Sequence, residues 1–249
     1  MERVTVSFLP RLPDDVELSG LAVVVVDLLR ASTTITYALH AGAKYVVPCR
    51  TREEALAVPP RLAHRTNDAP GVLLGGERCG VKIDGFDLGN SPAEYTRERV
   101  AGRVVAFTTT NGTHAILQSA AGGCVVIGCY ANLRVLAQEL VDAGRPVHIN
   151  CAGTGGAVTM EDCLFAGRLC TELMERGYQL ATSDETCMAR ALYQQAKRDP
   201  GGELGLMRSS VGGRNLQAIG HEADIELCRR EDVCPVVPVF DVKSGQIHI

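Results

Sequence analysis

The chain has 249 residues with a formal net charge of −4 at pH 7, and 46% of its residues are hydrophobic while 22% are charged. This composition is typical of a globular protein, and the length is sufficient to bury a full core. The acidic balance and the absence of tryptophan argue against a nucleic-acid-binding protein, because that function requires a basic surface and, for single strands, aromatic stacking.

The first residues and the apolar runs give no sign of export or membrane insertion. Residues 1–10 lack the basic start and apolar stretch of a signal peptide. The longest apolar run, LAVVVVDLL, is interrupted by Asp27 and is far shorter than the ~18 residues of a membrane span. The ten cysteines form no C-x-x-C pair and lie mostly in apolar runs, as free buried cysteines do. We therefore expect a cytoplasmic protein with no membrane or nucleic-acid partner.

Seven mostly apolar runs are predicted to form β-strands. They span residues 21–27, 44–49, 71–77, 103–108, 124–129, 146–151 and 234–240. Most are continuously apolar, which is typical of strands that are covered on both faces in a mostly parallel sheet. The last run contains Pro235 and Pro238, so it is expected at a sheet edge or as an irregular segment, because proline cannot donate a ladder hydrogen bond.

Segments with helical periodicity alternate with these strands. They span residues 32–41, 113–121, 132–143, 160–176, 184–198 and 203–230. Two capping boxes are expected at helix starts, Thr159-x-x-Asp162 in a looser aspartate version and Thr182-x-x-Glu185. Residues 57–71 are expected to form a surface loop because they are rich in proline and polar residues.

The alternation of strands and helices predicts an α/β fold, a three-layer α/β/α sandwich with a mostly parallel or mixed sheet. One domain, 1–249, is expected because no low-complexity linker divides the chain. Its C-terminal part, 160–230, is mainly helical, and the last helical segment is expected to break near Gly212-Gly213 or near Gly220.

Two segments share an order of elements. Residues 23–47 and 104–126 both run from a strand through a threonine-rich turn and a helix to a second strand, with matching residues about 79 positions apart from Thr34 and Thr113 onward. A duplication or two ordinary β-α-β units would each explain this likeness. The second explanation is favoured because such units resemble one another for physical reasons alone.

Four turns that follow predicted strands are unusually polar: 27–34, 75–80, 108–113 and 151–162. In α/β sheets, ligands bind outside the carboxyl ends of strands, where loops lead into helix N-termini. A helix N-terminus attracts phosphate or sulfonate through its free N–H groups and its partial positive charge. These turns are therefore the candidate site.

The turn TTTNGT at 108–113 has two interpretations, helix capping and anion binding. One threonine or asparagine suffices for a cap, and this turn carries several more. Gly112 would let the backbone approach a ligand closely, and the Asn111 amide and the threonine hydroxyls add donors. The turn from Gly153 to Gly156 repeats this chemistry at another strand end, which favours anion binding.

Carboxylates follow three of the predicted strands: Asp27, Glu77 and the pair Glu161-Asp162. Hard oxygen ligands beside an anion site suit Mg²⁺, which takes one or two carboxylates, waters and phosphate oxygens. The alternatives are a salt bridge from Asp27 to Arg30 and the capping box for Asp162. Carboxylates gathered with anion-binding turns at one end of a sheet favour a metal-assisted phosphate site.

Basic and amide side chains in the same turns are candidates for binding the ligand. Arg30 and Arg78 could donate to anionic oxygens, although a structural ion pair is the commoner role of an arginine. Asn90 and Ser91 lie outside these four turns, and a plain role as turn formers before Pro92 is one interpretation of them. The chain contains no P-loop, no G-x-G-x-x-G, no H-E-x-x-H and no G-x-S-x-G, which excludes those schemes by motif.

Four blocks of sequence resemble a known family. VVVVDLLRASTTITYALHAGA, LLGGERCGVKIDGFDLGNSPAEY, FTTTNGTHAI and CAGTGGAVTMEDCLFAG are similar to the motifs of the 2-phosphosulfolactate phosphatase (ComB) family. The resemblance runs from about residue 20 to the end and includes GGRNLQAIGHEADIELCRREDVCPVVPVF. One departure is Ser32, where the family is expected to have threonine.

The resemblance implies a Mg²⁺-dependent phosphoric monoester hydrolase that converts 2-phospho-3-sulfolactate to 3-sulfolactate and phosphate, a step of coenzyme M biosynthesis in methanogens. The pathway in this organism stays open, and a homodimer is one candidate assembly. Two alternatives stay open as well, a phosphatase for another small phosphorylated acid and a non-catalytic anion-binding protein.

The roles expected within this resemblance are inferred from residue type and position. The catalytic candidates are Asp27, Glu77 and Asp162. The metal-ligand candidates are Asp27, Glu77, Glu161 and Asp162. The substrate-binding candidates are Arg30, Arg78, Asn90, Ser91, Thr109, Thr110, Asn111, Gly112 and Thr113.

Overall fold

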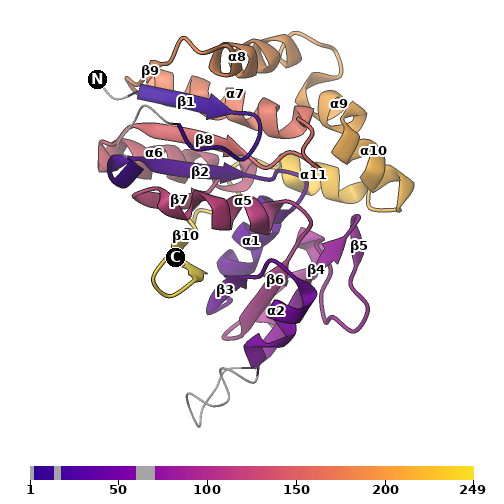
Figure 1. Ribbon diagram of the computed structural model, residues 1–249. Coiled ribbons are helices and arrows are strands. Elements are labelled where there is room, and N and C mark those ends of the chain that lie inside the picture. Colours follow the sequence, from indigo (N-terminus) through magenta and orange to yellow (C-terminus); the bar gives the residue numbers. More distant parts are fainter. Residues whose placement is uncertain (1–2, 14–17, 60–70) are drawn as a thin grey trace.

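A computed structural model describes residues 3–13, 18–59 and 71–249 (Figure 1). Within these residues, eleven strands form one mixed sheet in the order β5-β4-β6-β3-β11-β10-β7-β2-β8-β1-β9. Helices cover both faces of this sheet, so the predicted α/β sandwich is confirmed. No helix in the described part of the chain is both long and apolar enough to cross a lipid bilayer.

The strands are short, and several match the predicted apolar runs closely. They are β1 (Arg3–Ser7), β2 (Ala22–Val26), β3 (Tyr45–Pro48), β4 (Val72–Arg78), β5 (Val81–Lys82), β6 (Val104–Thr108), β7 (Cys124–Ile127), β8 (Val147–Cys151), β9 (Gln179–Leu180), β10 (Val239–Asp241) and β11 (Gln246–His248). The sequence analysis missed β1, β5, β9 and β11, because each is short or lacks a continuous apolar run.

The sheet consists of two parallel halves joined by the C-terminal hairpin. One half contains β4, β6 and β3, and the other contains β7, β2, β8, β1 and β9. The hairpin β10–β11 lies between them, with β11 antiparallel to β3 and β10 antiparallel to β7. Of the two expectations for residues 234–240, the edge strand is wrong, because β10 lies inside the sheet, whereas the irregular segment is confirmed for residues 234–238. Strand β10 begins only after Pro235 and Pro238.

The pairs β3–β11, β11–β10 and β10–β7 are all antiparallel. Because three reversals lie between them, the strands of one half point opposite to those of the other half in the order of the sheet. Six steps separate β4 from β2, and a twist of about 20–25° per step accumulates to well over 90°. In Figure 1, β6 is accordingly inclined steeply to β2. This twist allows the carboxyl ends of β2 and β4 to meet on one side of the molecule.

The helices occupy most of the predicted helical segments. They are α1 (Ala31–His40), α2 (Arg52–Leu56), α4 (Arg97–Val100), α5 (Gly112–Gln118), α6 (Leu133–Ala143), α7 (Met160–Glu175), α8 (Asp184–Ala196), α9 (Gly202–Ser209), α10 (Val211–Ala218) and α11 (Ala223–Arg229). Short 3₁₀ turns are η1 (Leu18–Gly20), η2 (Pro92–Glu94), η3 (Ser119–Ala121) and η4 (Tyr130–Asn132).

Strand β2 separates the two main cores. Val24 and Val26 belong to the core that includes α6 and α7, whereas Val23 and Val25 belong to the core that includes α1 and α5. All four side chains are fully buried. The continuous valine run therefore reflects a strand that is covered on both faces.

The C-terminal helical segment breaks at Ser210 and near Gly220. The Ser210 hydroxyl accepts a hydrogen bond from the Gly213 amide and caps α10, so Gly212 and Gly213 lie inside that helix rather than at its break. Gly213 is required there because a Cβ would collide with the Met207 carbonyl. The break near Gly220 is confirmed, since α10 ends at Ala218 and α11 begins at Ala223.

Neither capping box forms as predicted. Helix α8 begins at Asp184, and its N-cap is Ser183 rather than Thr182. Glu185 instead accepts hydrogen bonds from the Phe8 amide and from Arg11. Thr159 is the N-cap of α7, but its hydroxyl donates to the Asp162 carboxylate rather than accepting from the backbone.

The two similar segments form β2-α1-β3 and β6-α5-β7. Each connects one half of the sheet to the other, so neither is an ordinary parallel β-α-β unit with its strands in the same half. The predicted surface loop at 57–71 lies almost entirely outside the described residues. A duplication stays a hypothesis.

Candidate active site

The four polar turns meet at one cavity of about 360 Å³. The side chains and backbone that line it come from the ends of β2, β4, β6 and β8 and from the start of α10. The lining residues are Asp27, Leu29, Arg30, Glu77, Cys79, Gly80, Asn90, Thr110, Asn111, Gly153, Thr154, Gly155, Glu161, Asp162, Val211, Gly212, Asn215 and Leu216. The structure thus brings together four turns from residues 27–162 and the start of α10, whose Leu216 lies 189 positions after Asp27 in the chain.

Helix N-termini also point to this cavity. Arg30 immediately precedes α1, Glu161 and Asp162 belong to the first turn of α7, and Val211 and Gly212 begin α10. The free N–H groups and partial positive charge of such helix starts favour anionic ligands. The cavity therefore combines donors for an anion with several carboxylates.

Asp27 follows the buried strand β2 and lines the cavity. Its Oδ1 accepts a hydrogen bond from the Ala31 amide at 3.2 Å, which orients the carboxylate against the start of α1. Burial, together with the negative charges of Glu77 and then Glu161, raises the pKa of Asp27 to about 7. A group with this pKa is partly ionised at neutral pH and can accept a proton there.

The close fit around Asp27 extends to Gly112, the first residue of α5. A Cβ at Gly112 would lie 2.6 Å from Asp27 Oδ2 and would also crowd Ala31. Gly112 therefore contributes space for Asp27, and its role is packing against the carboxylate rather than lining the cavity.

Glu77 is held by three donors. Its Oε1 accepts from the Thr110 amide at 2.7 Å, and its Oε2 accepts from the Gly80 amide at 2.6 Å and from the Thr110 hydroxyl at 3.2 Å. Its side chain is buried. These bonds fasten the turn after β6 to the turn after β4 and fix the Glu77 carboxylate at the cavity.

Asp162 connects the ends of β2 and β8. Its Oδ1 accepts from the Leu28 amide at 2.8 Å, and its Oδ2 accepts from the Gly153 amide and the Thr159 hydroxyl, both at 3.0 Å. Burial and the charge of Glu161 raise its pKa well above the usual range. Because both oxygens already bind protein donors, the geometry gives Asp162 a bracing role.

Glu161 differs from Asp162 because one of its carboxylate oxygens has no hydrogen-bond donor. Its side chain is only 2% exposed, yet Oε2 has no hydrogen-bond partner among the described residues. The carboxylate packs so closely on α10 that a Cβ at Gly212 would collide with Oε1. Burial raises the pKa of Glu161, and a bond from Ser210 offsets part of that rise. A buried carboxylate oxygen without a donor is costly unless a cation or ligand approaches it.

The two candidate arginines have different roles. Arg30 is buried and lines the cavity, and its Nη1 donates to Asp224 at 2.6 Å. The alternative salt bridge from Asp27 to Arg30 is therefore wrong. Arg78 does not line the cavity; its guanidinium donates to the Glu77 carbonyl and the Thr108 hydroxyl. Arg78 thus connects strand ends through neutral oxygens, and among the described residues it forms neither the predicted contact with the cavity nor the ion pair that was its alternative.

The side chains of the threonine-rich turn divide between the start of α5 and the cavity. Thr109 and Thr113 bond to each other, each hydroxyl accepting from the other's amide at 3.1 and 3.3 Å, and neither lines the cavity. Thr110 and Asn111 do line it, and the Asn111 Oδ1 accepts from the Gly155 amide at 3.0 Å. The extra hydroxyls are therefore shared between capping the helix and shaping the cavity.

Asn90 and Ser91 likewise separate. The Asn90 side chain lines the cavity, and its buried Oδ1 has no partner among the described residues. Ser91 is buried away from the cavity and donates to Asp224 at 2.6 Å. The prediction that both contact the ligand directly is supported by position only for Asn90.

The carboxylates fit a divalent cation. Asp27, Glu77 and Glu161 gather negative charge, as the raised pKa of Asp27 indicates, and Glu161 offers an oxygen without a donor. Within the described residues, no group of three or more histidine, cysteine, aspartate or glutamate side chains is arranged to hold a metal ion by itself. Mg²⁺ needs only one or two carboxylates when waters and phosphate complete its shell, so this donor set suits it.

Sequence reasoning missed Asp224, which binds both Arg30 and Ser91, and missed the lining residues of α10, Gly212 and Asn215. These positions lie in helices rather than in polar turns after strands, so the turn pattern did not point to them. The only signal in the sequence was the resemblance of the C-terminal block to the family. Cys79 at the cavity mouth was also missed; it is exposed and adopts a positive φ of 53°.

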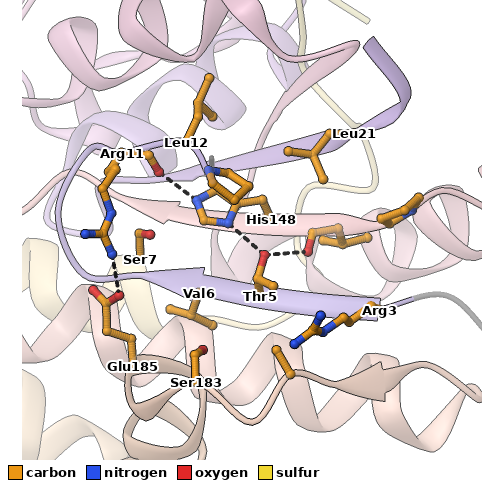
Figure 2. A pocket seen from close by; sticks show the side chains of 14 residues that line it. Arg3, Thr5, Val6, Ser7, Arg11, Leu12, Leu21, His148, Ser183 and Glu185 are labelled. Atoms are coloured by element: carbon orange, nitrogen blue, oxygen red, sulfur yellow. Dashed lines mark hydrogen bonds and ion pairs between the residues drawn. The ribbon is translucent and has the colours of Figure 1, made fainter. Parts of the chain in front are cut away.

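A second hollow of about 400 Å³ lies beside β1 and β8 (Figure 2). Its polar side chains are occupied by one another: His148 bonds to the Thr5 hydroxyl and to the Arg11 carbonyl, and Arg11 pairs with Glu185. Burial lowers the pKa of His148 and keeps its ring neutral. The polar groups of this hollow are therefore largely satisfied by one another, unlike those of the cavity at the strand ends, where Glu161 and Asn90 each have a buried oxygen without a partner among the described residues.

Comparisons with known proteins agree with the resemblance of the motifs. A family profile described as 2-phosphosulpholactate phosphatase matches residues 8–243. A relative from Symbiobacterium thermophilum is 39% identical over 236 residues, covering 95% of this chain and 97% of the relative. A relative from Synechococcus sp. is 39% identical over 240 residues, covering 92% and 94%, and one from Caldicellulosiruptor saccharolyticus is 35% identical over 245 residues, covering 96% and 97%. All three relatives carry the name "Probable 2-phosphosulfolactate phosphatase".

Proposed function

Because the chain belongs to the 2-phosphosulfolactate phosphatase family, we propose that it is a Mg²⁺-dependent phosphatase that hydrolyses 2-phospho-3-sulfolactate to 3-sulfolactate and phosphate. The family makes it a phosphoric monoester hydrolase. Magnesium dependence and the place in coenzyme M biosynthesis are parts of the proposal. The observation that supports it most is the meeting of buried carboxylates and anion-binding donors in one cavity.

Glu161 and Glu77 would hold the cation, Glu161 through the oxygen that lacks a protein donor and Glu77 through a carboxylate fixed by Thr110 and Gly80. When bound, Mg²⁺ would offset the charge of the phosphoryl oxygens and orient them. Asp162, like Glu77, has both carboxylate oxygens bound by protein donors, and it would be the alternative second carboxylate of this site.

The residues of the chain would then perform the proton transfer and bind the substrate. Asp27, with a pKa raised to about 7, would accept the proton of the attacking water as the water oxygen bonds to phosphorus. The bond from phosphorus to the ester oxygen would break, and the released oxygen would take a proton from Asp27 or from water to give the hydroxyl of 3-sulfolactate. Arg30, Asn90 and the N-termini of α7 and α10 would bind anionic oxygens of the substrate. The raised pKa thus supports a base that is ready at neutral pH.

A phosphate-release assay with and without EDTA tests the catalytic proposal. We expect Mg²⁺-dependent release of phosphate from 2-phospho-3-sulfolactate, with phosphoglycerate and phospholactate as comparison substrates. Equal turnover of all three would indicate a phosphatase for small phosphorylated acids in general. Tight binding of the ester without any release of phosphate would indicate the anion-binding protein instead.

The pathway and the assembly are separate predictions. Cells that lack this chain should accumulate the phosphorylated acid and lose 3-sulfolactate if the reaction feeds coenzyme M biosynthesis. A homodimer predicts a solution mass of twice the chain mass of 26.6 kDa, which light scattering measures.

A further inference from the structure

A buried polar network is centred on Asp224 of α11. Its Oδ2 accepts from Arg30 Nη1 at 2.6 Å, and its Oδ1 accepts from the Ser91 hydroxyl at 2.6 Å. His221 Nδ1 lies 3.3 Å from the same Oδ2. Asp224 is 3% exposed and does not line the cavity, whereas Arg30 is 2% exposed and does. Asp224 therefore reaches the cavity only through the residues it binds.

The guanidinium of Arg30 is held from two directions. Nη1 binds Asp224, and Nη2 donates to the Gly80 carbonyl at 2.7 Å in the turn after β4. These bonds use two of the five N–H groups of an arginine, which leaves others for a ligand. Arg30 is also the one cationic side chain among the described residues that line the cavity.

The neighbouring turn is fixed by the same network. The Asn90 carbonyl accepts from the Thr34 hydroxyl at 2.8 Å, and Ser91 is tied to Asp224. Asn90 is thereby held through its own carbonyl and through the next residue, Ser91. Its side-chain amide lines the cavity, and the buried amide oxygen has no hydrogen-bond partner among the described residues. Asp224 thus fixes both Arg30 and Asn90.

We propose that Asp224 is a positioning residue that holds Arg30 and Asn90 as the part of the cavity that binds a non-reacting anionic group of the substrate. This inference rests on the proposed function, because 2-phospho-3-sulfolactate carries a sulfonate and a carboxylate besides its phosphate. The carboxylates Asp27, Glu77 and Glu161 repel such groups, whereas a fixed guanidinium and an amide attract them. Asp224 would determine specificity without touching the substrate.

A double-mutant cycle tests this role. Asp224→Asn keeps the shape of the side chain and removes the charge that orients Arg30. We expect its kcat/KM for 2-phospho-3-sulfolactate to fall by about tenfold or more, mainly through KM, as for the loss of a bond to a charged group. In an Arg30→Gln background the same substitution should have a much smaller effect, because only the part that acts through Ser91 and Asn90 is left. For 2-phospholactate, which lacks the sulfonate, the effect of Asp224→Asn should be smaller.

A matched control separates positioning from stability. Glu203→Gln removes a partly buried ion pair with Arg229 outside the cavity, so it should lower the melting temperature without raising KM. If Asp224→Asn does not fold, Ser91→Ala serves as a second test variant. It removes only the bond between Ser91 and Asp224 and leaves the Asp224–Arg30 pair intact, so it should raise KM, but by less than is expected for Asp224→Asn. Unchanged KM in Asp224→Asn, or equal effects in both backgrounds, would overturn the inference.

Failure of the proposed function and failure of the inference about Asp224 can be told apart. If the wild-type protein releases no phosphate, the proposed function fails, and the same cycle is measured by calorimetric binding of 3-sulfolactate. Asp224→Asn should then weaken binding in the wild-type background and much less in Arg30→Gln. Equal weakening in both backgrounds, or none in either, would overturn the inference.

Discussion

Asp27 and Asp162 are two aspartates at strand ends whose hydrogen bonds give them different roles. Asp162 accepts from two buried amides and a hydroxyl, whereas Asp27 accepts from one amide and keeps an oxygen toward Gly112 and the cavity. Substitution should therefore separate chemistry from stability at these two positions.

Asp27→Asn should lower turnover by orders of magnitude while leaving the melting temperature unchanged or higher. An asparagine keeps the acceptor for the Ala31 amide and removes a charge that Glu77 and Glu161 repel. It cannot accept the proton of the water. Phosphate release and thermal unfolding on the same sample provide the measurement, and a large drop in melting temperature would contradict this prediction.

The pKa of Asp27 also predicts a pH dependence of stability. Because the folded pKa is about 7 and the unfolded value is near 4, ionisation destabilises the cation-free fold progressively as pH rises from about 4 to 7. We expect the melting temperature in EDTA to fall over this range, and to fall less in Asp27→Asn. Added Mg²⁺ should raise it most at pH 7, by mass action on the folded state. A melting temperature that rises with pH equally in both proteins would contradict this assignment.

At the scale of elements, the cavity is assembled by bonds between strand ends. Asp162 joins β2 to β8, Glu77 joins β4 to the turn after β6, and Asn111 reaches the turn at Gly155. Each bond fixes a loop against a neighbouring strand end, in addition to the ladder hydrogen bonds of the sheet. The geometry of the cavity therefore depends on these side chains as much as on the sheet.

Asp162→Ala should destabilise the protein by about 2–4 kcal/mol, because it leaves the buried Leu28 and Gly153 amides without partners. Chemical denaturation with urea gives this value. Asp184→Ala is a suitable control, since Asp184 is exposed at the start of α8, and there we expect a change within about 0.5 kcal/mol. Equal stability of the two variants would show that the brace contributes nothing.

At the scale of the whole molecule, the C-terminal hairpin completes the sheet. Phe240 and Ile247 are buried in the core that includes α1 and α5, and their strands pair with β7 and β3. Without this hairpin the two parallel halves would each expose an edge. The last residues of the chain thus hold together the halves whose ends form the cavity.

Ile247→Ala should cost about 2–5 kcal/mol of stability through lost burial and a cavity in the core. Ile249→Ala provides the matched control, because Ile249 is 66% exposed and should change stability by less than about 0.5 kcal/mol. Thermal or urea unfolding of both variants measures the difference. A similar loss in both would contradict the bridging role of β11.

The sequence by itself determined which segments are buried strands and which turns carry the chemistry. A run of valines in β2 has to be covered on both faces, and polar turns after strands have to lie at strand ends, so these features follow from local composition. Asp27, Glu77, Glu161, Asp162, Arg30, Thr110 and Asn111 were predicted from such turns, and Asn90 was predicted from the family resemblance. All of them line one cavity.

Only the tertiary structure decided how the strands are ordered and what each carboxylate contacts. The hairpin in the middle of the sheet, the pairing of Arg30 with Asp224 and the bracing role of Asp162 all join residues far apart in the chain. Contacts of this kind depend on sheet order and accumulated twist, which no local pattern encodes. Thr109, Thr113, Ser91 and Arg78 have the same residue chemistry as the lining residues, and only their orientation separates them.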